Sequence, residues 1–243
     1  MTGQTLKFGT IERDPDVRML TDMEAVIWDK AWYDQAEDRP LYFMYRDLFL
    51  DRHDSVVHEY DVRYDITVMP PGTLGREYVK TKGHYHPEAA QGLSFPEIYE
   101  VIQGEATYLM QRKAEDGTID DVRVVDATAG DKVIIPPNYG HITVNTGDRT
   151  LKMANWVSRQ FGSIYQDIEE RRGGAYYLAA NGDLVANNNY DDLPKPRRDE
   201  PREVPDLRIE SETPMYKMIQ RPNTLRFLNH PEKFEWLFDD ISR

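Results

Sequence analysis

Short runs of alternating apolar and polar residues fill the middle of the chain. They occur at residues 56–64, 66–69, 76–82, 97–102, 106–111, 119–126, 132–135, 141–145 and 151–157. A period of two predicts β-strands with one buried face and one wet face. Turn residues separate the runs, and Asn181-Gly182, between two further apolar pieces, is a strong hairpin signal. This spacing predicts an all-β sandwich or barrel over residues 51–190, in which a jelly roll would shield the strand edges.

The two ends of the chain depart from this pattern. Residues 1–50 predict an N-terminal arm that packs on the barrel, with helical pieces at 23–28 and 30–37 and an apolar patch at 41–45 that covers the barrel or a partner subunit. Residues 191–243 predict a tail. The proline- and charge-rich stretch 190–206 is typical of a solvated linker, and 231–241, which includes Trp236 and Ile241, is typical of a short amphipathic helix.

Composition narrows the classes of partner and compartment. The 243 residues carry a net charge of -13 and include no cysteine. The negative charge disfavours nucleic acid and anionic membranes as partners, and the lack of cysteine excludes disulfides and thiolate metal sites. No apolar run is long enough to cross a bilayer, and no signal-peptide pattern opens the chain. We therefore expect a cytoplasmic protein.

Three of the six histidines lie in two segments that carry turn and strand signals. His84 and His86 are two residues apart, so an extended backbone would point both imidazoles to one side. Glu97 opens the next strand run, and His141 follows a Pro-Pro turn. Taken singly, these residues are more often packing or solvated groups. Together, three imidazoles and one carboxylate predict an octahedral site for iron, manganese, zinc, nickel or cobalt with two open positions.

The spacing of these residues resembles the two-part motif of the cupin superfamily. Its glycine, His-x-His, Glu-x6-Gly, Gly-x5-Pro and His-x3-Asn positions are filled by Gly83, His84, His86, Glu97, Gly104, Gly130, Pro136, His141 and Asn145. Gly83 directly precedes the first histidine, where many cupins place their glycine further upstream, and the gap at 87–96 is unusually long. That gap, the run Thr-Lys-Gly-His-Tyr-His and the following Pro-Glu-Ile-Tyr resemble the cupin-type glucose-6-phosphate isomerases best known from archaea, over roughly residues 17–180.

This resemblance implies a homodimeric enzyme that interconverts glucose 6-phosphate and fructose 6-phosphate on a single cupin jelly-roll barrel. One divalent ion per subunit, with Fe²⁺ favoured, would hold substrate O1 and O2, and Glu97 would carry the proton; a hydride shift stays an alternative. Tyr99 shares a strand face with Glu97 and would point into the same cavity. The expected sugar and phosphate contacts are Thr67, Thr81, Lys82, Gly83 and Tyr165.

Some positions depart from the family and leave substrate preference and the ring-opening acid open. His58 stands where the family commonly has a tyrosine, and Tyr60, on the same face of the expected strand 56–64, could replace it as a substrate contact. Asn138 precedes Tyr139, where a tyrosine is commonly followed by tryptophan. Ser163 lies near the position of a histidine associated with ring opening.

Two other functions fit the same ligands. An iron-dependent cupin dioxygenase would use the open positions for oxygen and an organic substrate, but it would not need the phosphate contacts at Thr81–Gly83 and Thr67. A non-catalytic sugar-binding cupin would keep the histidines but would have no use for a carboxylate beside the substrate carbon. The isomerase is therefore the favoured hypothesis.

Overall fold

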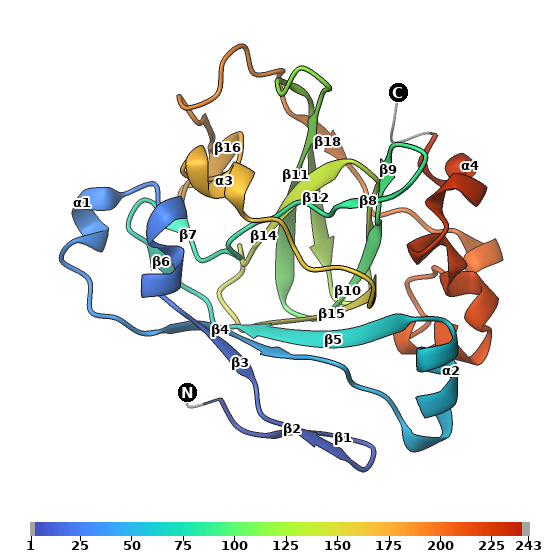
Figure 1. Ribbon diagram of the computed structural model, residues 1–243. Coiled ribbons are helices and arrows are strands. Elements are labelled where there is room, and N and C mark those ends of the chain that lie inside the picture. The colour runs from blue at the N-terminus through green and yellow to red at the C-terminus, as the bar shows by residue number, and fades with distance from the viewer. Residues whose placement is uncertain (1–2, 240–243) are drawn as a thin grey trace.

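The computed structural model describes residues 3–239, and two sheets hold most of its strands (Figure 1). The six-stranded sheet has the order β13 (Lys132–Ile135), β10 (Glu97–Gln103), β15 (Leu151–Ser158), β5 (Val62–Met69), β4 (Pro40–Tyr45), β3 (Asp16–Met19). The four-stranded sheet has the order β14 (Tyr139–Val144), β11 (Glu105–Lys113), β12 (Ile119–Thr128), β18 (Arg197–Asp199). Most neighbouring strands are antiparallel; β12 and β18 are parallel.

The chain passes back and forth between these sheets, which is the connectivity of a jelly roll. From β10 it crosses to β11 and β12, returns to β13, crosses to β14 and returns to β15. Each crossing follows a turn that the sequence predicts, because glycine or proline interrupts the alternation there. The predicted jelly-roll fold is confirmed, in a chain that is mostly β and also contains short helices. The predicted strands from 97 to 157 match β10 to β15 within a few residues.

The remaining elements are short. Four hairpins are formed by β1 (Leu6–Phe8) with β2 (Ile11–Arg13), β6 (Thr73–Leu74) with β7 (Glu77–Tyr78), β8 (Glu88–Ala90) with β9 (Leu93–Ser94), and β16 (Tyr176–Leu178) with β17 (Leu184–Ala186). The α-helices are α1 (Lys30–Tyr33), α2 (Asp54–Glu59), α3 (Gln166–Glu170) and α4 (Glu235–Phe238). Turns of 3-10 helix occupy Thr21–Val26, Asp51–His53, Pro205–Leu207, Met215–Gln220, Pro222–Leu228 and Pro231–Lys233. The hairpin at Asn181-Gly182 is as predicted.

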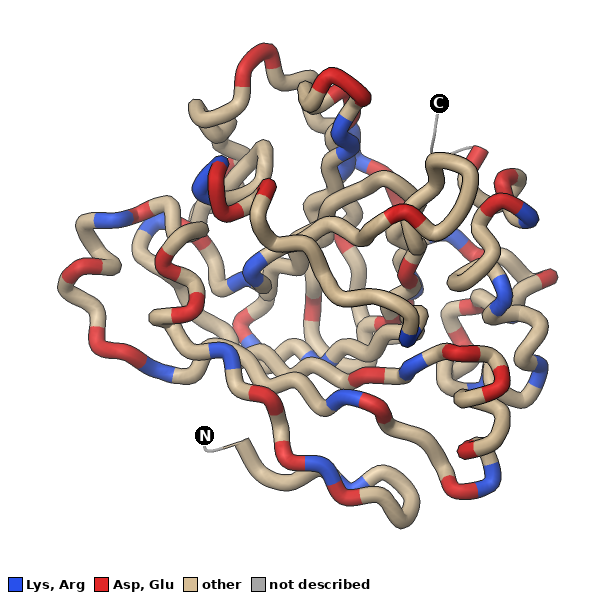
Figure 2. The backbone as a smooth tube through the Cα atoms, viewed as in Figure 1, with Lys and Arg blue, Asp and Glu red and all other residues tan. Residues whose placement is uncertain are grey.

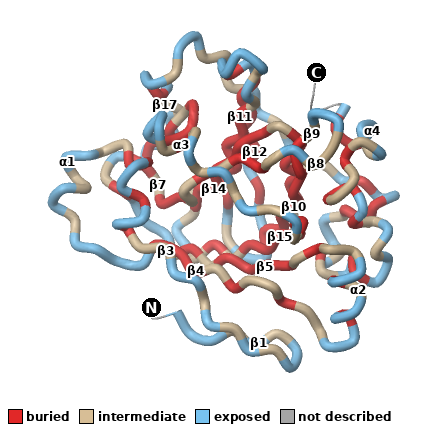
Figure 3. Tube along the Cα trace, viewed as in Figure 1, coloured by how far each residue is buried: buried red, intermediate tan, exposed pale blue. Residues whose placement is uncertain are grey.

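Both faces of the six-stranded sheet are covered, as the buried segments in Figure 3 indicate. One apolar cluster lies between the sheets and includes Val101, Tyr108 and Leu151. A second cluster joins outward-facing residues such as Ile98 and Trp156 to the C-terminal segment. Since strand residues alternate faces, neighbours such as Glu97 and Tyr99 point to the inner side.

The two ends of the chain belong to this fold more closely than the sequence suggests. The expected N-terminal arm contributes β3 and β4 as strands of the six-stranded sheet. The prediction of a solvated linker at 190–206 was wrong for Arg197–Asp199, which form β18 beside β12. The predicted helix at 231–241 corresponds to a 3-10 turn and α4, whose Leu237 is buried, whereas Trp236 is 48% exposed and Ile241 lies outside the described residues. The tail therefore docks on its own sheet (Figure 1).

The predicted strand at 56–64 was wrong in its first half. Residues Asp54–Glu59 form α2, and the strand β5 begins only at Val62. Asp61 has a left-handed φ of 51°, which ends the helical segment and redirects the chain into the sheet. A short alternating run is compatible with a strand or with a short helix. In α2 only Val57 is buried, so one apolar residue is enough to pack this helix against the rest of the chain.

Charged residues of both signs are distributed along the whole backbone (Figure 2). The acidic excess is therefore not gathered in one segment, and basic positions lie between the acidic ones. Within residues 3–239, no helix has the length and apolar character that a membrane crossing requires.

Candidate metal centre

The backbone brings the first and third histidines together. His84 and His141 form an isolated antiparallel bridge, with N to O distances of 3.3 Å and 3.0 Å in its two hydrogen bonds. Gly83, just before it, has a φ of 80°, and a Cβ there would lie 2.5 Å from Ile142 Cγ1. Only glycine fits this position, so the fold itself requires Gly83, independently of any contact with substrate.

Contacts with the neighbouring backbone also fix the orientation of Glu97 and His86. Glu97 is the first residue of β10 and pairs with Ile135 of β13, which fixes its carboxylate on the inner face. His86 Nδ1 lies 2.8 Å from the carbonyl oxygen of Phe95. Because a carbonyl can only accept, Nδ1 must carry the proton, and the lone pair of Nε2 faces the site.

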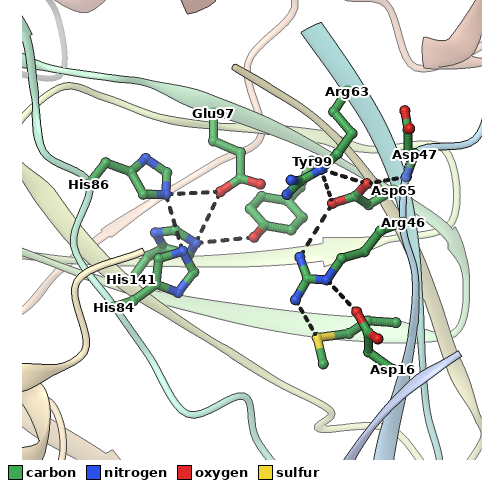
Figure 4. Close-up of polar contacts among 11 residues, drawn as sticks. Asp16, Arg46, Asp47, Arg63, Asp65, His84, His86, Glu97, Tyr99 and His141 are labelled. Carbon is green, nitrogen blue, oxygen red and sulfur yellow. Dashed lines mark hydrogen bonds and ion pairs between the residues drawn. The ribbon is translucent and has the colours of Figure 1, made fainter. Parts of the chain in front are cut away.

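The four predicted metal ligands converge (Figure 4). One ligand atom from each of His84, His86, Glu97 and His141 lies within 4.8 Å of all the others. Nε2 of His84 and Nε2 of His86 are 3.1 Å apart, and Glu97 Oε2 lies 3.5 Å from His86 Nε2 and 3.3 Å from His141 Nε2. Glu97 Oε2 is buried and has no hydrogen-bond partner among the described residues. Buried polar atoms are nearly always satisfied, so this donor set fits a divalent cation.

The electrostatics of the cluster suit neutral imidazoles and an ionised carboxylate. Burial lowers the pKa of His86 to about 4, and burial together with the other two imidazoles lowers the pKa of His84 well below its usual range. Burial raises the pKa of Glu97, but His141, His86 and the Tyr99 hydroxyl outweigh it, so the net pKa is lowered. These protonation states are the ones that metal ligation requires.

The centre opens into a cavity of about 270 Å³. Its walls come from the inner face of the six-stranded sheet and from the segments at 81–86 and 161–165. The lining residues are Arg18, Tyr42, Met44, Arg46, Arg63, Asp65, Thr67, Thr81, Lys82, Gly83, His84, His86, Glu97, Tyr99, Met153, Asn155, Val157, Phe161, Ser163 and Tyr165. All of the predicted phosphate and sugar contacts except His58 and Tyr60 line this cavity.

Tyr99 lies beside the cluster as its position on β10 predicts. Its hydroxyl is 3.1 Å from His141 Nε2, and in Figure 4 its ring lies between the histidines and Asp65. Burial and the neighbouring Glu97 raise the pKa of Tyr99 well above its usual range, so the phenol stays protonated. It is a neutral hydroxyl beside the ligand cluster.

His58 and Tyr60 do not line the cavity. His58 lies in α2 with its side chain 57% exposed, and its Nδ1 is 2.8 Å from the carbonyl oxygen of Asp54. The Tyr60 hydroxyl donates to Asn223 Oδ1 at 3.1 Å, in the C-terminal segment. Their expected place on a strand facing the substrate depended on the wrong assignment of 56–60.

Several cavity residues were missed from the sequence. Asp65 and Arg63 precede Thr67 on β5 at a spacing of two, so alternation from Thr67 could have identified them. Arg18 and Arg46 come from β3 and from the end of β4, which the sequence pattern assigned to an arm. Only the pairing of those strands with β5 reveals that they face the centre.

The long gap between His86 and Glu97 forms the β8–β9 hairpin. Asn138 holds this hairpin through two hydrogen bonds: Ser94 N donates to Asn138 Oδ1 at 2.9 Å, and Asn138 N donates to Ser94 Oγ at 2.6 Å. Phe95 stacks on Phe161, with ring centroids 4.8 Å apart. The extra residues are therefore ordered against the turn that precedes His141.

Comparison with known proteins identifies relatives of this chain. A family profile described as glucose-6-phosphate isomerase matches residues 17–195. The glucose-6-phosphate isomerase of Thermococcus litoralis is 29% identical over 176 residues, which cover 71% of this chain and 85% of that protein. The enzymes of Pyrococcus abyssi and Pyrococcus furiosus match with the same identity and coverage.

Solved structures with weaker likeness include two enzymes of oxalate chemistry. Oxalate decarboxylase of Lactobacillus farciminis has a TM-score of 0.37 and 22% identity over 51% of this chain and 30% of its own. An oxalate oxidase has a TM-score of 0.34 and 21% identity over 43% of this chain and 46% of its own. These TM-scores are too low to establish a shared fold, so the jelly-roll assignment rests on strand order. Since the family profile spans well over half of the sequence, the chain belongs to the glucose-6-phosphate isomerase family.

Proposed function

We propose that this protein interconverts glucose 6-phosphate and fructose 6-phosphate at the centre formed by His84, His86, Glu97 and His141. The observation that carries the proposal is the convergence of three imidazoles and an unpartnered buried carboxylate oxygen at the cavity that His84, His86 and Glu97 line. Family membership supplies the reaction, and the centre supplies residues suited to it.

The cofactor in this proposal is one divalent ion per chain, with Fe²⁺ favoured and Mn²⁺, Zn²⁺, Ni²⁺ or Co²⁺ as alternatives. His84, His86 and His141 would hold it through Nε2, and Glu97 through Oε2. When bound, such an ion supplies Lewis-acid stabilisation of negative charge on the substrate oxygens at C1 and C2.

Glu97 is the proposed proton carrier. In the direction from glucose 6-phosphate, its carboxylate would take the proton from C2 and return it to C1 of the same substrate, while the hydroxyl proton on O2 would pass to O1. Its lowered pKa keeps it ionised, and its burial restricts exchange of the carried proton with water. The Tyr99 hydroxyl, protonated and close to His141, would donate a hydrogen bond to a substrate oxygen. A hydride shift between C1 and C2 stays the alternative route.

The sugar and phosphate contacts in this proposal are Thr67, Thr81, Lys82, Gly83 and Tyr165, all of which line the cavity. Thr81 Oγ1 already accepts a hydrogen bond from Thr143 N at 2.9 Å, which orients the hydroxyl. The Tyr165 ring centroid lies 5.6 Å from that of His84, so Tyr165 borders the ligand cluster directly.

The proposal extends to the assembly and the compartment. We infer a homodimer for two reasons. The family resemblance implies one, and within residues 3–239 β3 leaves one edge of the six-stranded sheet unpaired, with Val17 40% exposed on it. A cytoplasmic location is consistent with the absence of cysteine. Light scattering coupled to size exclusion would distinguish a monomer from a dimer.

A coupled assay of fructose 6-phosphate conversion tests the function. The protein is assayed as purified, after chelation, and after separate addition of iron, manganese and zinc. We expect turnover that chelation abolishes and that at least one of these ions restores. Absence of turnover with every ion would remove the isomerase assignment.

A further inference from the structure

One aromatic ring separates the candidate metal centre from the guanidinium of Arg18. The Tyr165 ring centroid lies 5.6 Å from the His84 ring centroid, and Arg18 Cζ lies 5.8 Å from the Tyr165 centroid. All three residues line the same cavity. The six-carbon chain of a hexose, built from bonds of about 1.5 Å, can reach across one such ring. A group at C6 can therefore approach Arg18 when the C1 end lies at the centre.

The other three cations that line the cavity already have carboxylate partners. These pairs, with their N to O distances, are Arg63 with Asp65 at 2.9 Å, Lys82 with Glu169 at 2.5 Å and Arg46 with Asp16 at 2.9 Å. Figure 4 shows the pairs of Arg63 and Arg46 beyond Tyr99. An ion pair of this kind neutralises most of the local charge, so each of these three side chains attracts a further anion less than an unpaired cation does. Lys82 can still contact the substrate, but it contributes less to phosphate binding than an unpaired cation would.

Arg18 differs from these three. Within residues 3–239 its guanidinium forms no salt bridge, and its buried Nε has no hydrogen-bond partner. The guanidinium instead faces two aromatic rings, at 6.0 Å from the Tyr42 centroid and 5.8 Å from the Tyr165 centroid. Such contacts hold an arginine in place without neutralising it. Among the described residues Asp22 acts on Arg18 only as a charge beyond salt-bridge distance, so much of the positive charge of Arg18 remains available to a ligand in the cavity.

Tyr42 also places Arg18 beside the segment at 81–83. Arg18 on β3 is the register partner of Tyr42 on β4. The Tyr42 hydroxyl accepts a hydrogen bond from Lys82 N at 3.2 Å. The arginine, the Thr81 side chain and the Gly83 backbone therefore meet at one end of the cavity, where a phosphate would find a charge, a hydroxyl and an open backbone.

We propose that Arg18 anchors the phosphate of the substrate and so selects sugar phosphates over free sugars. This inference rests on the proposed function, which supplies the phosphorylated substrate. A guanidinium presents paired N–H donors that match two phosphate oxygens, which a lysine ammonium does not. Arg18 is a binding residue in this account and takes no part in proton transfer.

The test compares Arg18→Gln, Arg18→Lys and Arg46→Gln in the metal-loaded enzyme. Loss of a charged hydrogen-bond pair predicts a roughly 10- to 100-fold rise in KM for fructose 6-phosphate in Arg18→Gln, with a parallel loss of inhibition by inorganic phosphate. Metal content and kcat should change little. Arg18→Lys should recover part of the affinity, and Arg46→Gln, which removes an equal but already neutralised charge, should raise KM less.

Two results would overturn the inference about Arg18 and leave the isomerase assignment intact. These are an unchanged KM and phosphate inhibition in Arg18→Gln, or an equal rise in KM in Arg46→Gln, which would assign the effect to the general potential of the cavity. If the wild type has no isomerase activity, the proposed function fails first. Equilibrium binding of inorganic phosphate then decides: weaker binding to Arg18→Gln than to the wild type supports the anchor, and equal binding overturns it.

Discussion

His84 and His141 are held against each other by their own backbones. Their mutual hydrogen bonds close an isolated antiparallel bridge, and their ring centroids lie 4.5 Å apart. Because these hydrogen bonds join backbone atoms, the fold itself positions two of the four ligands. Preorganised ligands bind a metal with a smaller ordering cost than ligands on mobile loops.

Removal of one imidazole should therefore abolish metal binding without unfolding the protein. For His141→Ala and His84→Ala we expect loss of the bound metal and of nearly all turnover, with an unchanged far-ultraviolet spectrum. Metal analysis of the purified variants by mass spectrometry measures this directly. His230→Ala is the matched control, because His230 is a partly exposed histidine outside the cavity; it should keep both metal and activity.

Replacement of the proposed proton carrier should separate chemistry from metal binding. In Glu97→Gln the amide oxygen can still face the ion, but it cannot accept a proton. We expect kcat to fall by roughly 10²- to 10⁴-fold, the usual range for loss of a general base. A variant that keeps its metal and its full turnover would remove Glu97 from proton transfer and favour the hydride shift.

The C-terminal segment should be essential to stability through its buried aromatic residues. Phe227 is fully buried in the cluster on the outer face of the six-stranded sheet. Phe227→Ala should lower the free energy of unfolding by about 3–5 kcal/mol, as large cavities in cores do. Trp236→Ala, in the same tail but 48% exposed, should change it by less than about 1 kcal/mol. Urea unfolding of both variants gives the comparison; equal effects would contradict the docking of the tail.

Acid should weaken the attachment of β18. Burial raises the pKa of Asp121, but hydrogen bonds from Tyr139, Arg123 and Arg197 outweigh it, so the folded pKa lies below the ordinary 3.8. As the pH falls through this range, the unfolded chain takes up the proton first, and the stabilisation is lost. At neutral pH the wild type should therefore have a larger free energy of unfolding than Asp121→Asn. The difference between the two free energies should become smaller below about pH 4. A gap that does not depend on pH would show that the charge of Asp121 is not responsible.

Much of the fold and of the metal centre could be predicted from the sequence, because both depend on local signals. The strands from 97 to 157 alternate clearly. His84 and His86 are two residues apart, Glu97 opens a strand run and His141 follows a Pro-Pro turn, so local signals mark all four ligands that the fold brings together. The helix at 54–59 was missed because six residues fit either period. In such short segments, packing against the rest of the chain decides the structure.

The far wall of the cavity could not be predicted, because it depends on long-range pairing. Arg18 faces the centre only because β3 pairs with β4 and β4 with β5. No local pattern specifies that order. The packing of the tail could not be predicted either. Its buried residues are scattered among prolines and charged residues, and they form a core only where they pack against Trp156 and its neighbours.

The central claim is that four side chains, separated along the chain, hold one divalent ion in the cavity. Anomalous diffraction from crystals of iron-loaded protein, recorded on both sides of the iron absorption edge, measures this most directly. We predict one strong anomalous peak per chain, roughly 2.0–2.3 Å from Nε2 of His84, His86 and His141 and from a Glu97 oxygen. A map without such a peak, or with iron bound only elsewhere, would contradict the account.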